Sequence, residues 1–191
     1  MPMTLARSID IDCCDRVAPT PVSPAQPLMA LLTELSAVIQ NLTDAQYVQK
    51  PVGVMPSSVG GHVRHCLDHV AALVEARQSN TLNYDHRQRG TPIENDREAA
   101  AAAVRAQVDA LSAWHESDLA ADISLSVLLT SDGQPINVGS TLGRELAYTV
   151  SHTIHHNAII GAMVKTLGGL LPDCFGFAPA TLRDAAHRKA G

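Results

Sequence analysis

The sequence is poor in aromatic residues, which make up 3% of its 191 residues, although hydrophobic residues make up 46%. Aromatic and β-branched side chains are enriched in strands, whereas alanine and leucine suit helices that pack on one another. The composition therefore favours packed helices over a β-sandwich. The length fits one domain with a sizeable core.

The sequence has no excess of basic residues, because its formal net charge is −5. Proteins that bind nucleic acids or anionic membranes usually present a strongly basic surface. We therefore expect a small-molecule substrate as the partner, and neither nucleic acid nor a membrane.

An apolar run long enough to cross a bilayer is also missing. Near the C-terminus, Lys165 interrupts the longest run and Pro172 ends it. At the N-terminus, Asp10 and Asp12 fall where a signal peptide needs an unbroken apolar stretch. We therefore expect a cytoplasmic protein.

The four cysteines are too few for a disulfide framework in a chain of 191 residues. Two of them, Cys13 and Cys14, are adjacent, and we expect reduced thiols. They lie in residues 1–23, where prolines and charges alternate without periodicity. We interpret residues 1–23 as an irregular arm and residues 24–191 as a helical domain with a C-terminal tail.

Helical spacing of apolar residues and capping residues predict four main helices, over about 25–41, 58–78, 96–115 and 141–168. Residues 79–94 read as a polar connection. From residue 123 the sequence ISLSVLLT alternates and SDG is a turn signal, so a small hairpin or irregular loop is expected, although Pro135 disfavours a regular strand. One more short helix is expected after Pro179. The simplest arrangement is an all-α, four-helix bundle.

Six of the nine histidines lie in two short windows of the predicted helices. His152 and His156 are one helical turn apart, the spacing that lets two imidazoles from one helix reach the same metal ion. His155 points about 60° away from His152 at 100° per residue. His62, His65 and His69 lie within about 100° of one another on the second helix, so one of them could supply a third ligand.

Three neutral imidazoles with open positions suit zinc, nickel, iron or manganese. Such an ion activates a bound water or thiol, which supports hydrolysis, isomerisation or thiol transfer. Carboxylates near the clusters are few, and no Glu-x-x-His motif of the di-iron type occurs. Asp68 is the best carboxylate to orient a ligand histidine, while Glu145 and Tyr148 could do so only if their helix face points inward. Cys66 is expected to pack in the core.

The segments SVGGHVRHCLDHV and HTIHHNAIIGAMVKTLG together resemble those of the DinB-like (DinB/YfiT) superfamily of metal-dependent enzymes, over roughly residues 25–170. The resemblance implies a four-helix bundle in up-down-down-up order and a divalent metal held by His65, His152 and His156, with Asp68 after the first ligand. His62 and His69 exceed the family pattern, and either could replace His65. Family members are often dimers, which implies a possible homodimer.

Characterised members of that superfamily include S-transferases that use low-molecular-weight thiols and a thiol-dependent maleylpyruvate isomerase. The resemblance therefore implies a thiol-dependent S-transferase that acts on small molecules. A metal-dependent hydrolase and a non-catalytic metal or small-molecule binding protein of stress responses remain as alternatives. A further alternative is a helical bundle whose histidines only pack or meet solvent.

Overall fold

The computed structural model describes residues 22–53 and 55–190, so nearly all of the predicted arm, including Cys13 and Cys14, lies outside the described residues. Most of the described chain is helical. The long helices are α1 (Gln26–Asn41), α3 (Val59–Ser79), α4 (Arg97–Ser112) and α5 (Leu142–Thr166). These bounds confirm the four predicted helices to within a few residues.

Side-chain caps explain where three of these helices begin. The hydroxyl of Ser58 accepts a hydrogen bond from the Gly61 amide at 3.1 Å, at the start of α3. Asp96 and Thr141 cap α4 and α5 in the same way. Such caps satisfy backbone N–H groups that lack a partner within the helix.

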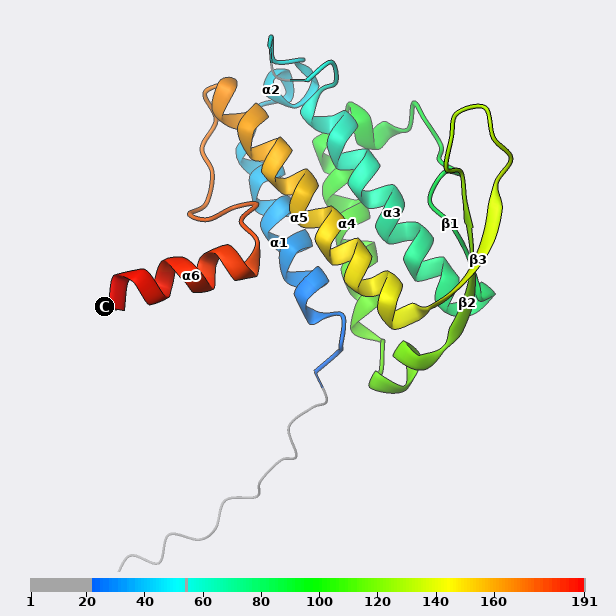
Figure 1. Ribbon diagram of the computed structural model, residues 1–191. Coiled ribbons are helices and arrows are strands. Elements are labelled where there is room, and N and C mark those ends of the chain that lie inside the picture. Colours follow the sequence, from blue (N-terminus) through cyan, green and yellow to red (C-terminus); the bar gives the residue numbers. More distant parts are fainter. Residues whose placement is uncertain (1–21, 54, 191) are drawn as a thin grey trace, which may run out of the picture.

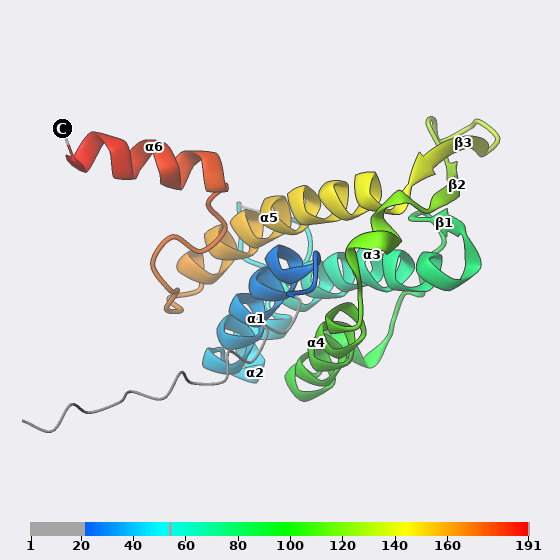
Figure 2. The same ribbon diagram turned by 90° about the horizontal axis from the view of Figure 1, so that it is seen from below.

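The four long helices lie side by side (Figures 1 and 2), with α1 and α3 each in contact with both α4 and α5. The apolar stripes that predicted the helices face this shared interior. On α1 the fully buried residues are Leu28, Leu32, Leu35, Val38 and Ile39. Burial of each such side chain stabilises the fold by roughly 1.5–3 kcal/mol relative to an exposed one.

A three-stranded sheet of β1 (Thr81–Asn83), β2 (Asp122–Val127) and β3 (Ile136–Thr141) lies beside the helices, in the order β1-β2-β3 (Figure 1). β2 and β3 form an antiparallel hairpin, which is one of the two alternatives expected for this segment, and β3 begins directly after Pro135. β1 pairs with β2 in parallel, within the segment expected to be a polar connection. The all-α prediction therefore needs correction, since the fold contains a small sheet. The sequence did not reveal β1, because a three-residue strand in which only Leu82 is buried has no periodic signal.

Short helices complete the described chain: α2 (Asp44–Val48), η1 (Pro92–Glu94), η2 (Glu116–Ala120) and α6 (Pro179–Ala190). α6 confirms the helix expected after Pro179 and extends away from the long helices (Figure 1). The start of α3 packs closely on η1, since a Cβ at Gly60 would lie 2.1 Å from the carbonyl oxygen of Glu94. None of the helices among the described residues has the length and apolar character needed to cross a membrane.

Candidate metal centre

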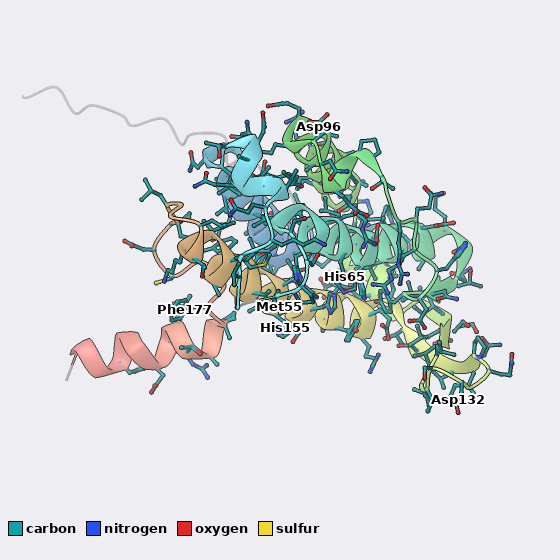
Figure 3. All side chains as sticks on the ribbon, turned by 90° about the horizontal axis from the view of Figure 1, so that it is seen from above. Met55, His65, Asp96, Asp132, His155 and Phe177 are labelled. Carbon is teal, nitrogen blue, oxygen red and sulfur yellow. The ribbon has the colours of Figure 1, made fainter. Side chains whose placement is uncertain are left out.

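Five histidines meet between α3 and α5, and we call them the histidine cluster: His62, His65, His69, His152 and His156. Three come from α3 and two from α5, at the helical spacings that the sequence predicted. Figure 3 labels His65 where α3 and α5 run next to each other. His155 is exposed, as its different helical direction requires.

Within the cluster, one trio has the closest approach of possible ligand atoms. One ring nitrogen from each of His65, His69 and His152 lies within 4.8 Å of the other two. The rings of His69 and His152 stack with centroids 3.9 Å apart. These three imidazoles could hold a metal ion together.

His156 lies directly beside this trio. Its ring centroid is 4.6 Å from that of His65 and 4.5 Å from that of His152. The predicted ligands His65, His152 and His156 are thus mutual neighbours, while the closest trio contains His69 instead of His156. His62 extends the cluster, because its Nδ1 is 3.4 Å from Nδ1 of His156.

The surroundings of the ring nitrogens fit a metal ion. Nδ1 of His69 donates to the carbonyl oxygen of His65 at 3.1 Å, so the lone pair of the neutral ring is on Nε2. Ligand histidines commonly have such a carbonyl partner. The Nε2 atoms of His62 and His152 are buried without a hydrogen-bond partner among the described residues. Buried polar atoms without a partner are costly, and coordination would satisfy them.

The cluster is electrostatically poised to stay neutral. Burial, followed by the neighbouring imidazoles, lowers the pKa of His65 and His156 to about 3 and that of His152 to about 4. Burial also lowers the pKa of His62 and His69. All five rings are therefore neutral near pH 7, and a neutral imidazole is the form that binds a metal.

The connection between β1 and α4 adds two side chains that the sequence analysis did not assign to the site. The ring of Tyr84 stacks on His69 with centroids 4.9 Å apart and an angle of 12°. Arg87 donates from Nη1 to Nδ1 of His65, so the proton of this neutral ring is on Nε2, and a metal ion bound by Nδ1 of His65 would take the place of the Arg87 donor. No spacing rule could find them, because a loop folds back on the helices and brings them there.

Tyr84 links the cluster to Glu145, which is fully buried in the first turn of α5. The Tyr84 hydroxyl donates to Oε2 of Glu145 at 3.1 Å and lies 3.2 Å from Oγ1 of Thr149. Ser140 and Arg144 also donate to this carboxylate. Burial is the main reason that the pKa of Tyr84 is raised, so this phenol remains a donor.

Asp68, the carboxylate expected to orient a ligand histidine, is engaged elsewhere. Its Oδ2 accepts from Arg64 at 2.7 Å, and Arg64 also pairs with Glu94 at 2.9 Å. Among the described residues, no hydrogen bond joins Asp68 to an imidazole. Glu145 is linked to the cluster instead, because it accepts a hydrogen bond from Tyr84 and the ring of Tyr84 stacks on His69.

A pocket of about 290 Å³ opens on the cluster. Its walls are Ser57, Gly61, His62, Arg64, His65, Arg87, Arg89 and His156. A larger cavity of about 830 Å³ lies between α3, the sheet and the loop after β1, and Arg87 borders both cavities. The larger cavity contains none of the five cluster histidines, so the smaller one is the candidate substrate site.

Cys66 is confirmed as a core residue. It is fully buried, and its Sγ lies 3.7 Å from Oγ1 of Thr153. Burial raises the pKa of its thiol to about 11. Cys66 is therefore neither a thiolate nor a wall of the pocket.

The fold is similar to those of solved DinB-like proteins. A DinB-like protein from Bacillus subtilis matches with a TM-score of 0.59 and 16% identity, over 81% of this chain and 98% of that one. A second, from Bacillus cereus, matches with a TM-score of 0.54 and 18% identity, over 77% of this chain and 92% of that one. At these identities the likeness concerns the fold alone.

In sequence, the chain is 39% identical over 157 residues to FK506-binding protein 5 of Rhizopus delemar. The match covers 81% of this chain and 36% of that protein, so the chain spans about a third of the relative's length. The sequence profile of the DinB superfamily matches residues 28–160, which include all five cluster histidines. This chain therefore belongs to the DinB superfamily.

Proposed function

We propose that this protein is a divalent-metal-dependent S-transferase that joins a small thiol to a small electrophilic molecule. The observation that carries the proposal is the histidine cluster. Nε2 of His62 and Nε2 of His152 are buried without a partner among the described residues, and His62, His65 and His156 line an open pocket. The pocket has no cysteine in its walls. An external thiol would therefore act as the nucleophile.

The proposed metal ligands are His65 and His152 with a third imidazole. The family pattern favours His156 as the third ligand, while the closest approach of ring nitrogens favours His69. Zinc, nickel, iron and manganese all accept such ligands. The chemistry that a divalent ion supplies at this kind of site is Lewis acidity, which lowers the pKa of a bound thiol or water.

Residues around the cluster would hold a candidate ligand histidine in place. Tyr84 fixes His69 by stacking, and Glu145 fixes Tyr84 through its hydroxyl. In the transfer, the thiol sulfur forms a bond to the electrophilic carbon, and the leaving group departs with its electron pair. The thiol proton passes to solvent, because the neighbouring imidazoles resist protonation.

In this proposal the long helices form the up-down-down-up bundle of the superfamily, and a homodimer is the proposed assembly. The helix contacts support a four-helix bundle, since each of α1 and α3 touches both α4 and α5. The course of the chain in Figure 1 supports the order, since α1 and α5 run in one direction and α3 and α4 in the other. Size-exclusion chromatography with light scattering tests the homodimer. A mass of one chain, against 20.3 kDa from the sequence, would refute the dimer.

The decisive test combines metal analysis with turnover. The purified protein is analysed for metal and then assayed with zinc, nickel, iron or manganese, a panel of thiols and an electrophilic aromatic halide. We expect near-stoichiometric metal and product formation that depends on both metal and thiol. Hydrolysis of a test ester without thiol would replace the transferase by a metal-dependent hydrolase, and stoichiometric metal without turnover would favour a non-catalytic binding protein.

A matched pair of variants identifies the third ligand. His69→Gln and His156→Gln remove one candidate nitrogen each and keep His65 and His152. The variant that loses metal more strongly marks the ligand. Equal retention of metal in both would contradict a site built on these imidazoles.

A further inference from the structure

The pocket beside the histidine cluster has an unbalanced charge. Its eight wall residues include three arginines and no carboxylate. Arg64 is already balanced, because it pairs with Asp68 at 2.7 Å and with Glu94 at 2.9 Å. The other two, Arg87 and Arg89, have no carboxylate within ion-pair distance among the residues that the structure describes.

Arg87 is the more constrained of the two. It is partly buried, its Nη1 donates to His65, and its Nε is buried without a hydrogen-bond partner in the described part of the chain. A guanidinium presents five donors in a planar fork that matches the two oxygens of a carboxylate. Keeping such a cation next to neutral imidazoles is costly unless an anion joins it.

His62 points to a ligand in the same place. It is 8% exposed, it lines the pocket, and its Nε2 has no partner among the described residues. The pocket thus combines an unbalanced guanidinium with a buried ring nitrogen that could meet a ligand atom. A divalent ion on the cluster would add positive charge and strengthen the attraction for an anion.

We propose that this pocket binds an oxyanion group, a carboxylate or a phosphate, carried by the small thiol or by its acceptor, with Arg87 as the principal contact and Arg89 at the rim. The proposal rests on the proposed function for the identity of the reactants. It limits the substrates to anionic molecules, because an uncharged analogue would leave the charge of Arg87 without an anion to balance it. A volume of about 290 Å³ suits a small organic acid.

The first experiment compares two thiols of similar size on the cobalt-loaded protein. Binding of mercaptoacetate and of 2-mercaptoethanol is measured by the thiol-to-cobalt absorption band. We expect mercaptoacetate to bind at least about tenfold more tightly, because a charged hydrogen bond is lost with the uncharged thiol. This preference should disappear in Arg87→Gln, survive in part in Arg87→Lys, and be unchanged in Arg105→Gln, an exposed arginine of α4.

An equal preference in wild type and Arg87→Gln would overturn the proposal, since the carboxylate would then contact the metal alone. Circular dichroism confirms that each variant is folded. If Arg87→Gln does not fold, Arg87→Lys and Arg89→Gln are compared with the wild-type protein instead. An unchanged preference for mercaptoacetate in both variants would then overturn the proposal.

The second experiment needs neither thiol nor metal, so it separates this inference from the proposed function. Acetate, inorganic phosphate and uncharged acetamide are titrated into the metal-free protein, and the histidine ring signals are followed by NMR. We expect saturable shifts of the His62 and His65 signals with acetate or phosphate, and none with acetamide. The more effective anion identifies the group, and the absence of any Arg87-dependent shift would overturn the proposal. Failure of thiol binding with success here would refute only the transferase.

Discussion

The two faces of the helical interior differ in what they bury. Where α1 meets α4, the interior is apolar, and Leu28, Leu32 and Leu35 of α1 and Ala100 and Val104 of α4 are all at most 2% exposed. Where α3 meets α5, the interior contains buried imidazoles and a carboxylate. Apolar burial stabilises a fold directly, whereas buried polar groups do so only when they are satisfied. The α1–α4 contact, which we call the apolar face, therefore stabilises the fold. The α3–α5 contact, which we call the polar face, contains the candidate metal centre and stabilises the fold less.

Replacement of a ligand histidine between α3 and α5 should have the strongest effect, which is loss of the metal. His152→Ala should reduce near-stoichiometric metal to a trace, with affinity at least about a hundredfold weaker, because even partners of ligands are worth 10–100-fold. Elemental mass spectrometry and competition with a chelator measure it. His155→Ala, an exposed neighbour on the same helix, should keep its metal. Full occupancy in His152→Ala would remove this histidine from the site.

On the apolar face, Leu32→Ala should lower the free energy of unfolding by about 2–5 kcal/mol, because it leaves a cavity in a fully buried place. The folded variant should still bind one equivalent of metal. Urea unfolding of the metal-free protein measures the loss. Thr33→Ala, exposed on the same helix, should change stability by less than about 0.5 kcal/mol. Loss of metal in folded Leu32→Ala would show that the two faces are not separable.

Acid should destabilise the polar face of the metal-free protein. The pKa values of His65 and His156 are lowered to about 3 and that of His152 to about 4, so between these values and the ordinary 6.5 the unfolded chain binds more protons. Stability is therefore unaffected by these groups above pH 6.5 and falls as the pH drops below it. We expect a loss of more than about 1 kcal/mol from pH 7 to pH 5, measured by urea unfolding.

A variant isolates the contribution of the cluster to this acid sensitivity. His62→Gln combined with His156→Gln removes two buried titrating groups and should make the dependence between pH 7 and pH 5 weaker, while His65, His69 and His152 retain the rest of it. A slope equal to that of the wild-type protein would assign the acid sensitivity to other groups.

The smallest effect concerns the link from the cluster to Glu145. Tyr84→Phe keeps the ring that stacks on His69 and removes the hydroxyl that donates to Glu145, which should cost about 1 kcal/mol of stability. Metal stoichiometry should not change. Tyr148→Phe is the matched control, because the Tyr148 hydroxyl has no hydrogen bond with any described residue. Equal losses in both variants would contradict a special role for the Tyr84 hydroxyl.

The long helices and the helix faces that carry the histidines follow from local sequence patterns. Apolar residues at helical spacing and caps such as Ser58 act locally, so they can be read without the rest of the fold. The i, i+4 relation of His152 and His156 is likewise a property of one helix. The motifs around them were enough to indicate the superfamily that the comparisons show.

The side chains that meet at the site are brought together by packing between distant parts of the chain. β1, Tyr84 and Arg87 lie in a segment without periodicity, and their positions depend on contacts with β2 and α3 rather than on neighbouring residues. The place of His69 in the closest trio depends on how α3 rotates against α5, which one helix cannot determine. Local patterns thus fix the elements and their faces, while long-range packing fixes the set of atoms that a ligand can reach.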